Sequence, residues 1–467
     1  MTTIAGMTAV EALIDSLPRE IVISDPDIVA SYAHDQSRFT DSAPPAAVLV
    51  PRTTGEVSAC LAAAHSNSVA VIPRGAGSGL SGAANATAGA VVLSLHRMTA
   101  IREIDTVDRL AVVEPGVVTA DLRARAADAG LFYPPDPGSV AFSTIGGNVA
   151  TNAGGMCCVK YGVTGDFVLA LEVVLADGRI LRTGRRTVKG VAGYDLTHLL
   201  VGSEGTLGVI TEITVKLLPA PREARTLVAS FPTLEKAGLA VAEIASSGST
   251  PSMLEILDRT TVQAVDRMTK MGMGEDTAAL LLVQSDDVDA ESVLAAIEST
   301  CDRLGASDVV VSSDQAEAAM LLEARRLALP ALESLGDWLL DDVAVPCSRI
   351  TDLIGYIEGL AAELGLTIGV FGHAGDGNLH PTIIYDESDA SSKAAALSAF
   401  DAITRRALDL GGTITGEHGV GRLKSGWLAV EHDETSMQVQ RAVKAALDPT
   451  GILNPGCAPA APVRANV

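Results

Sequence analysis

The chain has 467 residues, with 57 Asp or Glu against 34 Lys or Arg, and its formal net charge is -23 at pH 7. This length is enough for two or three domains, each with its own core. Such acidity, without a run rich in Lys or Arg, argues against nucleic acid and anionic membranes as partners.

The N-terminal residues, the lengths of the apolar stretches and the cysteine spacing indicate a cellular compartment. The first residues, MTTIAGMTAVEALIDSLPREIVIS, lack the basic and uninterrupted apolar regions of a secretory signal. No stretch reaches the uncharged apolar length of an integral membrane segment. The six cysteines have no CxxC or ferredoxin-like spacing, and the adjacent Cys157 and Cys158 suit a structural role. We expect a reduced, cytoplasmic protein without its own iron–sulfur cluster.

The first elements alternate between helix and strand. The pattern predicts an amphipathic helix from Ala9 to Leu17, strands over 46–52 and 69–74, and a helix over 53–67 between these strands. The two strands and their helix form a predicted βαβ unit.

The loop RGAGSGLSGAANATAG follows the second of these strands. Gly77, Gly79 and Gly82 satisfy GxGxxG, but the chain then enters a strand over 90–95 and not a helix, so the loop is not a Rossmann turn. Successive glycine N–H groups can line a nest around a pyrophosphate, with Arg74 as a charged contact. The alternative is a mobile surface loop.

Two further glycine-rich segments follow. Thr119 is predicted to cap a helix that ends at Gly130, and residues 133–162 then combine prolines with glycines and neutral hydrogen-bonding side chains. Residues 168–181 predict a hairpin with Asp177 and Gly178 at its turn, and SEGTLG precedes a further strand. Three such loops in one α+β domain indicate an extended nucleotide ligand.

The most informative segment is FGHAGDGNLH, between two β-branched runs. Asp376 and Gly377 predict a two-residue type I′ turn, which places His373 directly opposite His380 with Cβ atoms about 5 Å apart. About forty residues later, GGTITGEHGVG frames Glu417 and His418 with glycines. Two histidines and a carboxylate form a three-ligand set with open positions for substrate or water. The alternative is a set of hydrogen-bonded histidines in a core.

Seven motifs, in order, resemble the FAD-linked D-2-hydroxyacid dehydrogenases, which are flavoproteins of the vanillyl-alcohol oxidase class. The motifs are RGAGSGLSG, PPDPGS, TIGGNVATNAGG, KGVAGYDLTHLLVGSEGTLGVIT, GHAGDGNLH, GEHGVG and LNPG, between about residue 40 and residue 457. The resemblance implies an α+β fold, with a two-subdomain FAD-binding domain over 1–220 and an α+β cap domain over 221–412. A C-terminal segment over 413–467 would return to the FAD site.

The resemblance also implies which residues hold FAD. The pyrophosphate would be wrapped by Arg74, Gly75, Ala76, Gly77 and Ser78. The flavin would be lined by Ser139, Thr144, Gly147, Asn148, Asn152 and Gly155, the adenosine or ring-facing backbone held by Glu204, Gly208 and Ile210, and the site closed by Asn454. Relatives with covalent flavin carry a histidine in the first loop, where this chain has Ala76 and Ser78, so FAD is expected to be non-covalent.

Oxidation of a 2-hydroxy acid needs a group that acidifies the hydroxyl, a base and a carboxylate clamp. By the resemblance, His373, His380 and Glu417 would hold a divalent metal (Zn, Fe or Mn). His418 would be the base, because an imidazole titrates near neutrality. Arg325 would clamp the substrate carboxylate with its guanidinium fork, while Arg326, about 100° further round the helix, would point away.

Departures from the family pattern indicate the substrate. D-2-hydroxyglutarate enzymes carry a lysine where this chain has Leu340 and Asp341, and Pro381 with Thr382 match the glycolate and D-lactate members. A small 2-hydroxy acid with one carboxylate is therefore expected. Cys457 stands where many relatives have lysine.

Three alternatives remain at this stage: a D-2-hydroxyglutarate dehydrogenase, a non-catalytic flavin electron-transfer subunit, and an alkyl-transferring relative. The metal cluster disfavours the second, and the chain length the third. The sequence leaves open the metal, the substrate side chain and the electron acceptor, which is a quinone, an electron-transfer flavoprotein, a cytochrome or oxygen. It also leaves open homodimer formation, an iron–sulfur partner subunit and peripheral attachment to a membrane through the acceptor.

Overall fold

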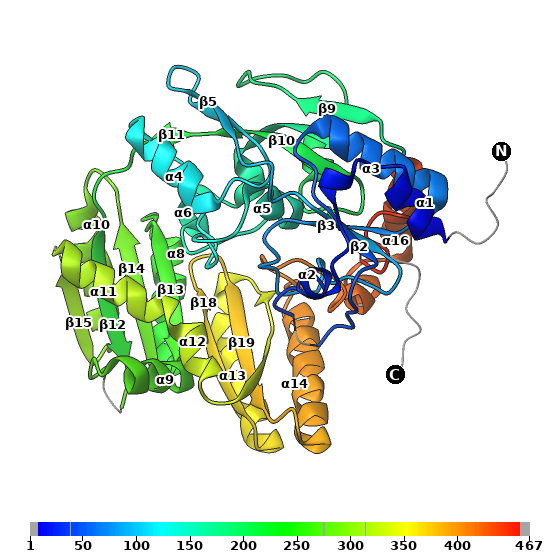
Figure 1. Ribbon diagram of the computed structural model, residues 1–467. Coiled ribbons are helices and arrows are strands. Elements are labelled where there is room, and N and C mark those ends of the chain that lie inside the picture. The colour runs from blue at the N-terminus through cyan, green and yellow to red at the C-terminus, as the bar shows by residue number, and fades with distance from the viewer. Residues whose placement is uncertain (1–7, 38, 274–275, 313, 458–467) are drawn as a thin grey trace. The chain divides into compact units, whose positions relative to one another are not determined.

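The computed structural model describes residues 8–457 except 38, 274–275 and 313 (Figure 1). Its contacts divide the chain into two compact units. The first comprises Met1–Ala153, Val163–Ala220 and His418–Val467, and the second comprises Gly154–Gly162 and Pro221–Glu417. The C-terminal return to the first unit thus begins at His418. No helix in the described ranges has the length and apolar character that crossing a membrane requires.

The first unit contains a small sheet whose strands lie in the order β1-β2-β4-β3. Its strands are β1 (Val22–Ile23), β2 (Ala47–Leu49), β3 (Val71–Arg74) and β4 (Val91–Ser94), and its helices are α1 (Ala9–Asp15), α2 (Pro26–Ala30) and α3 (Thr54–Asn67). The strand β4 pairs in parallel with both β2 and β3, so it separates the two strands of the predicted βαβ unit. Residues of α1 and α3 share one apolar core with this sheet, and Ile452 and Leu453 enter the same core.

A second sheet of this unit is antiparallel, in the order β5-β6-β10-β8-β9. Its strands are β5 (Ile101–Asp105), β6 (Leu110–Val113), β8 (Val168–Val174), β9 (Ile180–Gly184) and β10 (Val209–Lys216), and the short β7 (Leu131–Phe132) pairs with β11 (Leu218–Pro219). The predicted hairpin over 168–181 is confirmed, with Gly178 at a φ of 88° in its turn. The helices are α4 (Thr119–Asp128), α5 (Ile145–Thr151), α7 (Leu196–Leu200), α15 (Leu428–Glu431) and α16 (Glu434–Leu447).

The predicted cap of α4 is wrong. The residue before the helix is Val118, and Thr119 is the first helical residue. The Thr119 hydroxyl instead donates to the Ser143 carbonyl at 3.1 Å and lies 2.9 Å from the Ser143 hydroxyl. The Thr119 side chain therefore bonds to Ser143, which is remote in sequence, and does not cap its own helix.

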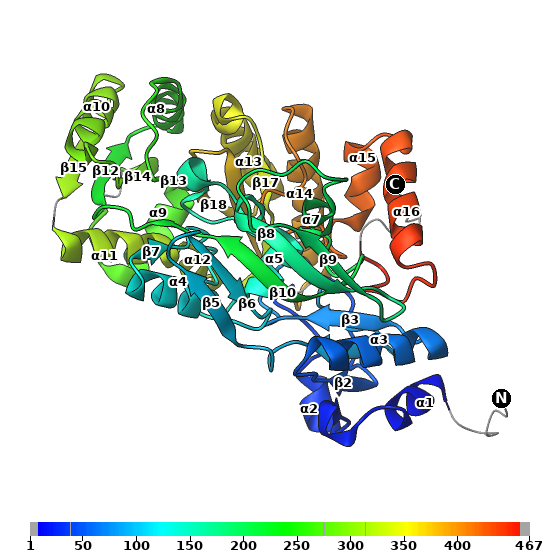
Figure 2. The ribbon, with the colours of Figure 1, turned by 90° about the horizontal axis from the view of Figure 1, so that it is seen from above.

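The second unit is one antiparallel sheet in the order β15-β12-β14-β13-β18-β19-β16, with β17 also paired to β19. The strands are β12 (Arg225–Phe231), β13 (Met253–Asp258), β14 (Ala279–Ser285), β15 (Asp308–Ser312), β16 (Asp337–Leu340), β17 (Val343–Ala344), β18 (Thr367–His373) and β19 (Asn378–Tyr385). Helices α8 (Leu234–Ser246), α10 (Ala290–Arg303), α13 (Ile350–Leu364) and α14 (Ala390–Asp409) lie on one face of this sheet (Figure 2). Helices α9 (Arg259–Thr269), α11 (Gln315–Arg326) and α12 (Ala328–Glu333) lie on the other, and α6 (Cys158–Tyr161) contacts β13.

The hairpin of β18 and β19 does not have the predicted register. His373 pairs with Asn378, and His380 pairs with Phe371, so the loop has four residues rather than two. Only Gly377 of this loop has a positive φ, 85°, whereas a type I′ turn needs two. The error is two residues, and a shift of two keeps every side chain on its face of the sheet. His373 and His380 therefore still converge, with ring centroids 5.1 Å apart.

Gly377 and Gly365 make a matched test of this loop. Both have positive φ, but a Cβ on Gly377 would lie 1.9 Å from the Val345 carbonyl oxygen, whereas one on Gly365 meets nothing within 4 Å. We predict that Gly365→Ala lowers stability by about 1 kcal/mol, and that Gly377→Ala costs clearly more because the backbone at Val345 must move. Thermal unfolding of both variants checks this, and equal losses would contradict the described loop.

Candidate functional site

Three side chains of the second unit converge on one point. His373 ends β18, His380 lies in β19, and Glu417 is the last residue of the unit. The distance from Glu417 Oε1 to each of the two Nε2 atoms is 3.2 Å, and the Nε2 atoms are 3.4 Å apart. All three residues of the predicted metal set are thus brought together.

This triangle fits a metal ion. Ligand atoms about 2.1 Å from one ion lie about 3.0 Å apart in octahedral and about 3.4 Å apart in tetrahedral directions. Two histidines and one carboxylate are also a donor set that suits Zn and non-haem Fe. Donor chemistry and spacing therefore both match a divalent metal that keeps open positions.

Glu255, which the sequence did not single out, supports His373 from behind. Its fully buried carboxylate lies 2.7 Å from His373 Nδ1 through Oε1 and accepts the Arg325 Nε–H at 2.6 Å through Oε2. In a neutral imidazole, a hydrogen bond donated from Nδ1 leaves a lone pair on Nε2, the atom that faces His380 and Glu417. The only sequence signal was an isolated acidic residue inside the apolar run MLEILD.

These buried charges shift one another's pKa values. Burial alone raises the pKa of Glu255, but Arg325 and His373 outweigh burial and hold it below its usual value. Burial also raises the pKa of Glu417, yet His373 and His380 bring it well below its usual value. Both carboxylates are therefore ionised near neutral pH, and they attract a cation.

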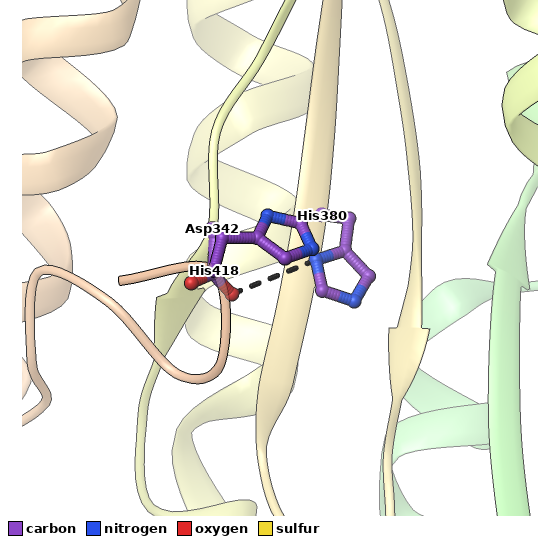
Figure 3. A group of neighbouring side chains, drawn as sticks. All are labelled: Asp342, His380 and His418. Atoms are coloured by element: carbon purple, nitrogen blue, oxygen red, sulfur yellow. Dashed lines mark ion pairs between the residues drawn. The ribbon is translucent and has the colours of Figure 1, made fainter. Parts of the chain in front are cut away.

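Asp342 is a second residue that the sequence analysis missed. It lies 3.6 Å from His380 Nδ1 as an ion pair, drawn as the dashed line in Figure 3. The same oxygen, Oδ1, accepts a hydrogen bond from Asn378 Nδ2 at 2.7 Å, and the other oxygen, Oδ2, accepts the backbone N–H groups of Gly416 and Glu417 at 2.9 and 3.0 Å. One carboxylate thus lies beside one predicted ligand and fixes the backbone of another.

Buried charge also favours a divalent ion. Glu255, Asp342 and Glu417 bring three carboxylates to this cluster, and Arg325 brings one guanidinium. Metal ligation requires neutral imidazoles, and a divalent cation would offset part of the negative charge of these carboxylates.

Arg325 and Arg326 lie as the helix geometry predicted. The Arg325 side chain is 7% exposed and the Arg326 side chain 53% exposed. Arg325 uses Nε and Nη2 on Glu255, and its guanidinium carbon lies 4.9 Å from the centre of the Phe371 ring. Within the described part of the chain, Nη1 makes no hydrogen bond, so the protein leaves one donor group of this guanidinium unused.

In the first unit, the loop after β3 fits an anionic group. No hydrogen bond among the described residues is donated by the backbone N–H groups of residues 75–79. Gly77 has a φ of 74°, and a Cβ there would lie 2.0 Å from Arg74 Nη2, so the arginine packs behind the loop. Five successive amides without acceptors are what a nest for a diphosphate requires.

Several side chains expected at the flavin have partners within the protein. Thr144 caps α5 by accepting the Gly147 N–H at 3.3 Å, Asn148 donates to the Thr119 hydroxyl at 2.8 Å, and Asn152 accepts the Gly165 N–H at 2.8 Å. The Ser139 carbonyl accepts two backbone N–H groups. Gly208 directly precedes β10, and Ile210 lies within that strand. Gly155 belongs to the second unit. The side chains of Thr144, Asn148 and Asn152 therefore hold the backbone of their own segment in place.

Glu204 holds the segment that carries His418. Its carboxylate accepts the Gly421 N–H at 2.9 and 3.1 Å and also the Val420 N–H. Asn454 Nδ2 in turn donates to the Glu204 carbonyl at 2.8 Å and to the Ala83 carbonyl at 2.9 Å. Glu204 and Asn454 were expected at FAD, and the structure gives their side chains contacts that fix the loop after His418.

Comparison with known proteins decides the family. Residues 220–457 match the family described as "FAD linked oxidases, C-terminal domain", and residues 45–184 match "FAD binding domain". The chain belongs to the FAD-linked oxidases. Over 428 residues, which are 91% of each chain, it is 43% identical to the glycolate oxidase subunit GlcD of Bacillus subtilis. It is 36% identical over 459 residues, 96% of each chain, to a D-lactate dehydrogenase of Anaerostipes hadrus.

A solved structure supports the fold of this FAD-linked oxidase. The 4-ethylphenol oxidase from Gulosibacter chungangensis aligns with a TM-score of 0.79 at 20% identity, covering 99% of this chain and 100% of that one. The expected α+β class, with a flavin-binding domain of the vanillyl-alcohol oxidase type, is confirmed. The unpaired amides of residues 75–79 lie inside the segment that matches the FAD binding domain.

Glu204 should give the stability of this oxidase a pH dependence. Burial, only partly offset by the two N–H groups, raises its pKa from 4.5 to about 7. A folded-state pKa above the unfolded one means that the contribution of Glu204 to stability is present below pH 4.5 and is lost as the pH rises through 7. Relative to Glu204→Gln, the wild type should lose roughly 3 kcal/mol over this range. Unfolding of both at pH 4.5 and 8 tests this, with the exposed Glu235→Gln as control, and a constant difference would contradict it.

Proposed function

We propose that the protein oxidises a small D-2-hydroxy acid, of the D-lactate or glycolate type, to the 2-oxo acid, using non-covalent FAD and a divalent metal. The observation that carries this proposal is the triangle of His373, His380 and Glu417 ligand atoms in a chain of the FAD-linked oxidases. Identity of 43% to a glycolate oxidase subunit and 36% to a D-lactate dehydrogenase supports the substrate class.

Different residues would perform different parts of the proposed reaction. His373, His380 and Glu417 would hold the metal, and Arg325 would bind the substrate carboxylate through Nη1. His418, which follows Glu417 directly, would accept the hydroxyl proton. When bound, the metal supplies Lewis acidity that lowers the hydroxyl pKa, and FAD supplies the acceptor for the hydride from C2. The hydroxyl proton and the C2 hydride account for both hydrogens lost by the substrate.

The number of buried cations supports a substrate with one carboxylate. Among the described residues of the second unit, Arg325 is the one Arg or Lys that is buried. At the position of the dicarboxylate enzymes' lysine, Leu340 is buried, and Asp341 accepts a hydrogen bond from Thr404. A second carboxylate, as in D-2-hydroxyglutarate, would therefore have no buried cation to meet.

Anaerobic flavin bleaching tests the reaction. We predict that D-lactate, D-2-hydroxybutyrate or glycolate bleaches the bound flavin, that chelation abolishes bleaching, and that added metal restores it. His418→Ala should slow flavin reduction by about 10²-fold to 10⁴-fold, because it removes the base. His198→Ala, an exposed histidine on α7, is the control and should reduce normally. Reduction that survives chelation would refute the metal role, and faster reduction by D-2-hydroxyglutarate would refute the substrate size.

Glu255 gives an independent test of the metal site. Glu255→Gln removes the negative charge behind His373 and leaves Arg325 without its partner. We predict that metal affinity falls about 10-fold to 100-fold, as measured by competition with a chromophoric chelator. Glu323→Gln changes an exposed carboxylate on α11 and should leave affinity unchanged. Unchanged affinity in Glu255→Gln would contradict the support by Glu255.

A further inference from the structure

Arg422 of the first unit is a partly buried arginine whose guanidinium makes no ion pair with the described residues. Its Nε and Nη2 atoms are shielded from solvent and have no hydrogen-bond partner among the described residues. None of the ion pairs of the described chain involves it. Shielding part of a guanidinium from water without an anion costs free energy, and a ligand that supplies the anion reduces that cost.

The backbone of Arg422 is tied to the loop that follows β3. The N–H groups of Arg422 and Leu423 both donate to the Ser81 carbonyl at 3.0 Å. Ser81 comes two residues after Gly79, the last of the five amides without acceptors. A Cβ on Gly421 would lie 2.1 Å from the Ser81 carbonyl oxygen, so the two segments are in close contact.

The guanidinium itself has a defined place. A Cβ on Gly456 would lie 2.3 Å from Arg422 Nη1, so the side chain extends over the backbone of Gly456. Burial and then the negative charge of Glu204 raise the pKa of the Cys457 thiol to about 12, and the positive charge of Arg422 acts in the opposite direction. Arg422 is thus held between the loop after β3 and the C-terminal segment of the same unit.

We propose that Arg422 pairs with the diphosphate of bound FAD, beside the amide nest of residues 75–79. The diphosphate is the permanently anionic part of this cofactor, and a guanidinium fork suits phosphate oxygens. The amides of residues 75–79 lack acceptors among the described residues, and Arg422 lacks an anion there. Ser81 links the two segments, and both features are complementary to a diphosphate. The inference rests on FAD binding and does not depend on the identity of the substrate.

The test uses the full-length protein, both with FAD and after removal of FAD. Arg422→Met keeps the length of the side chain and removes its charge. It should lower the affinities for FAD and ADP by at least about 10-fold and leave the affinity for riboflavin, which has no phosphate, unchanged. Arg422→Lys should restore part of the lost affinity, and Arg125→Met, at an exposed position on α4, should change nothing.

Thermal unfolding separates this role from a structural one. Because Arg422→Met removes a partly buried charge without an ion-pair partner among the described residues, it should raise the unfolding temperature of the FAD-free chain and reduce the stabilisation that FAD confers. Equal weakening of FAD and riboflavin, or unchanged FAD affinity in a folded Arg422→Met variant, would overturn the proposal. A shift in the flavin midpoint potential with unchanged FAD and ADP affinity would also overturn it, since the charge would then act on the flavin ring.

Discussion

The contact between the Glu255 carboxylate and His373 Nδ1 is the interaction on which the candidate metal site depends. It leaves Nε2 as the atom that faces His380 and Glu417. Glu255 can stay ionised inside the protein because Arg325 is buried beside it. The same arginine is also the proposed substrate clamp, so metal ligation and carboxylate binding share one buried ion pair.

The three proposed ligands were predictable because two kinds of sequence signal agreed. Histidines beside glycines at a hairpin tip, and Glu417 in a second glycine-rich segment, both point to ligands and not to core packing. The register was wrong by two residues, since only Gly377 adopts a positive φ, but the two-residue period of a strand kept His373 and His380 on one face. The alternation of side chains along a strand therefore predicted that His373 and His380 converge, although the predicted turn type was wrong.

The residues that support the ligands could not be predicted, because their partners are remote in sequence. Glu255 is 118 residues from His373, and Asp342 contacts the backbone of Glu417 across 75 residues. The side-chain partner of Glu204 was equally unpredictable. Its motif suggested a cofactor contact, whereas its carboxylate accepts the backbone N–H of Gly421, 217 residues away. An acidic residue in an apolar strand indicates a buried partner, but only the fold identifies that partner.

The proposed reaction requires that His373, His380 and Glu417 bind one metal ion. Anomalous diffraction from crystals of the holoenzyme, recorded at the absorption edges of Zn, Fe and Mn, would locate that ion. We expect one anomalous peak about 2.0–2.3 Å from His373 Nε2, His380 Nε2 and a Glu417 carboxylate oxygen. A fully loaded, active enzyme with no peak there, or with its metal on other ligands, would contradict it.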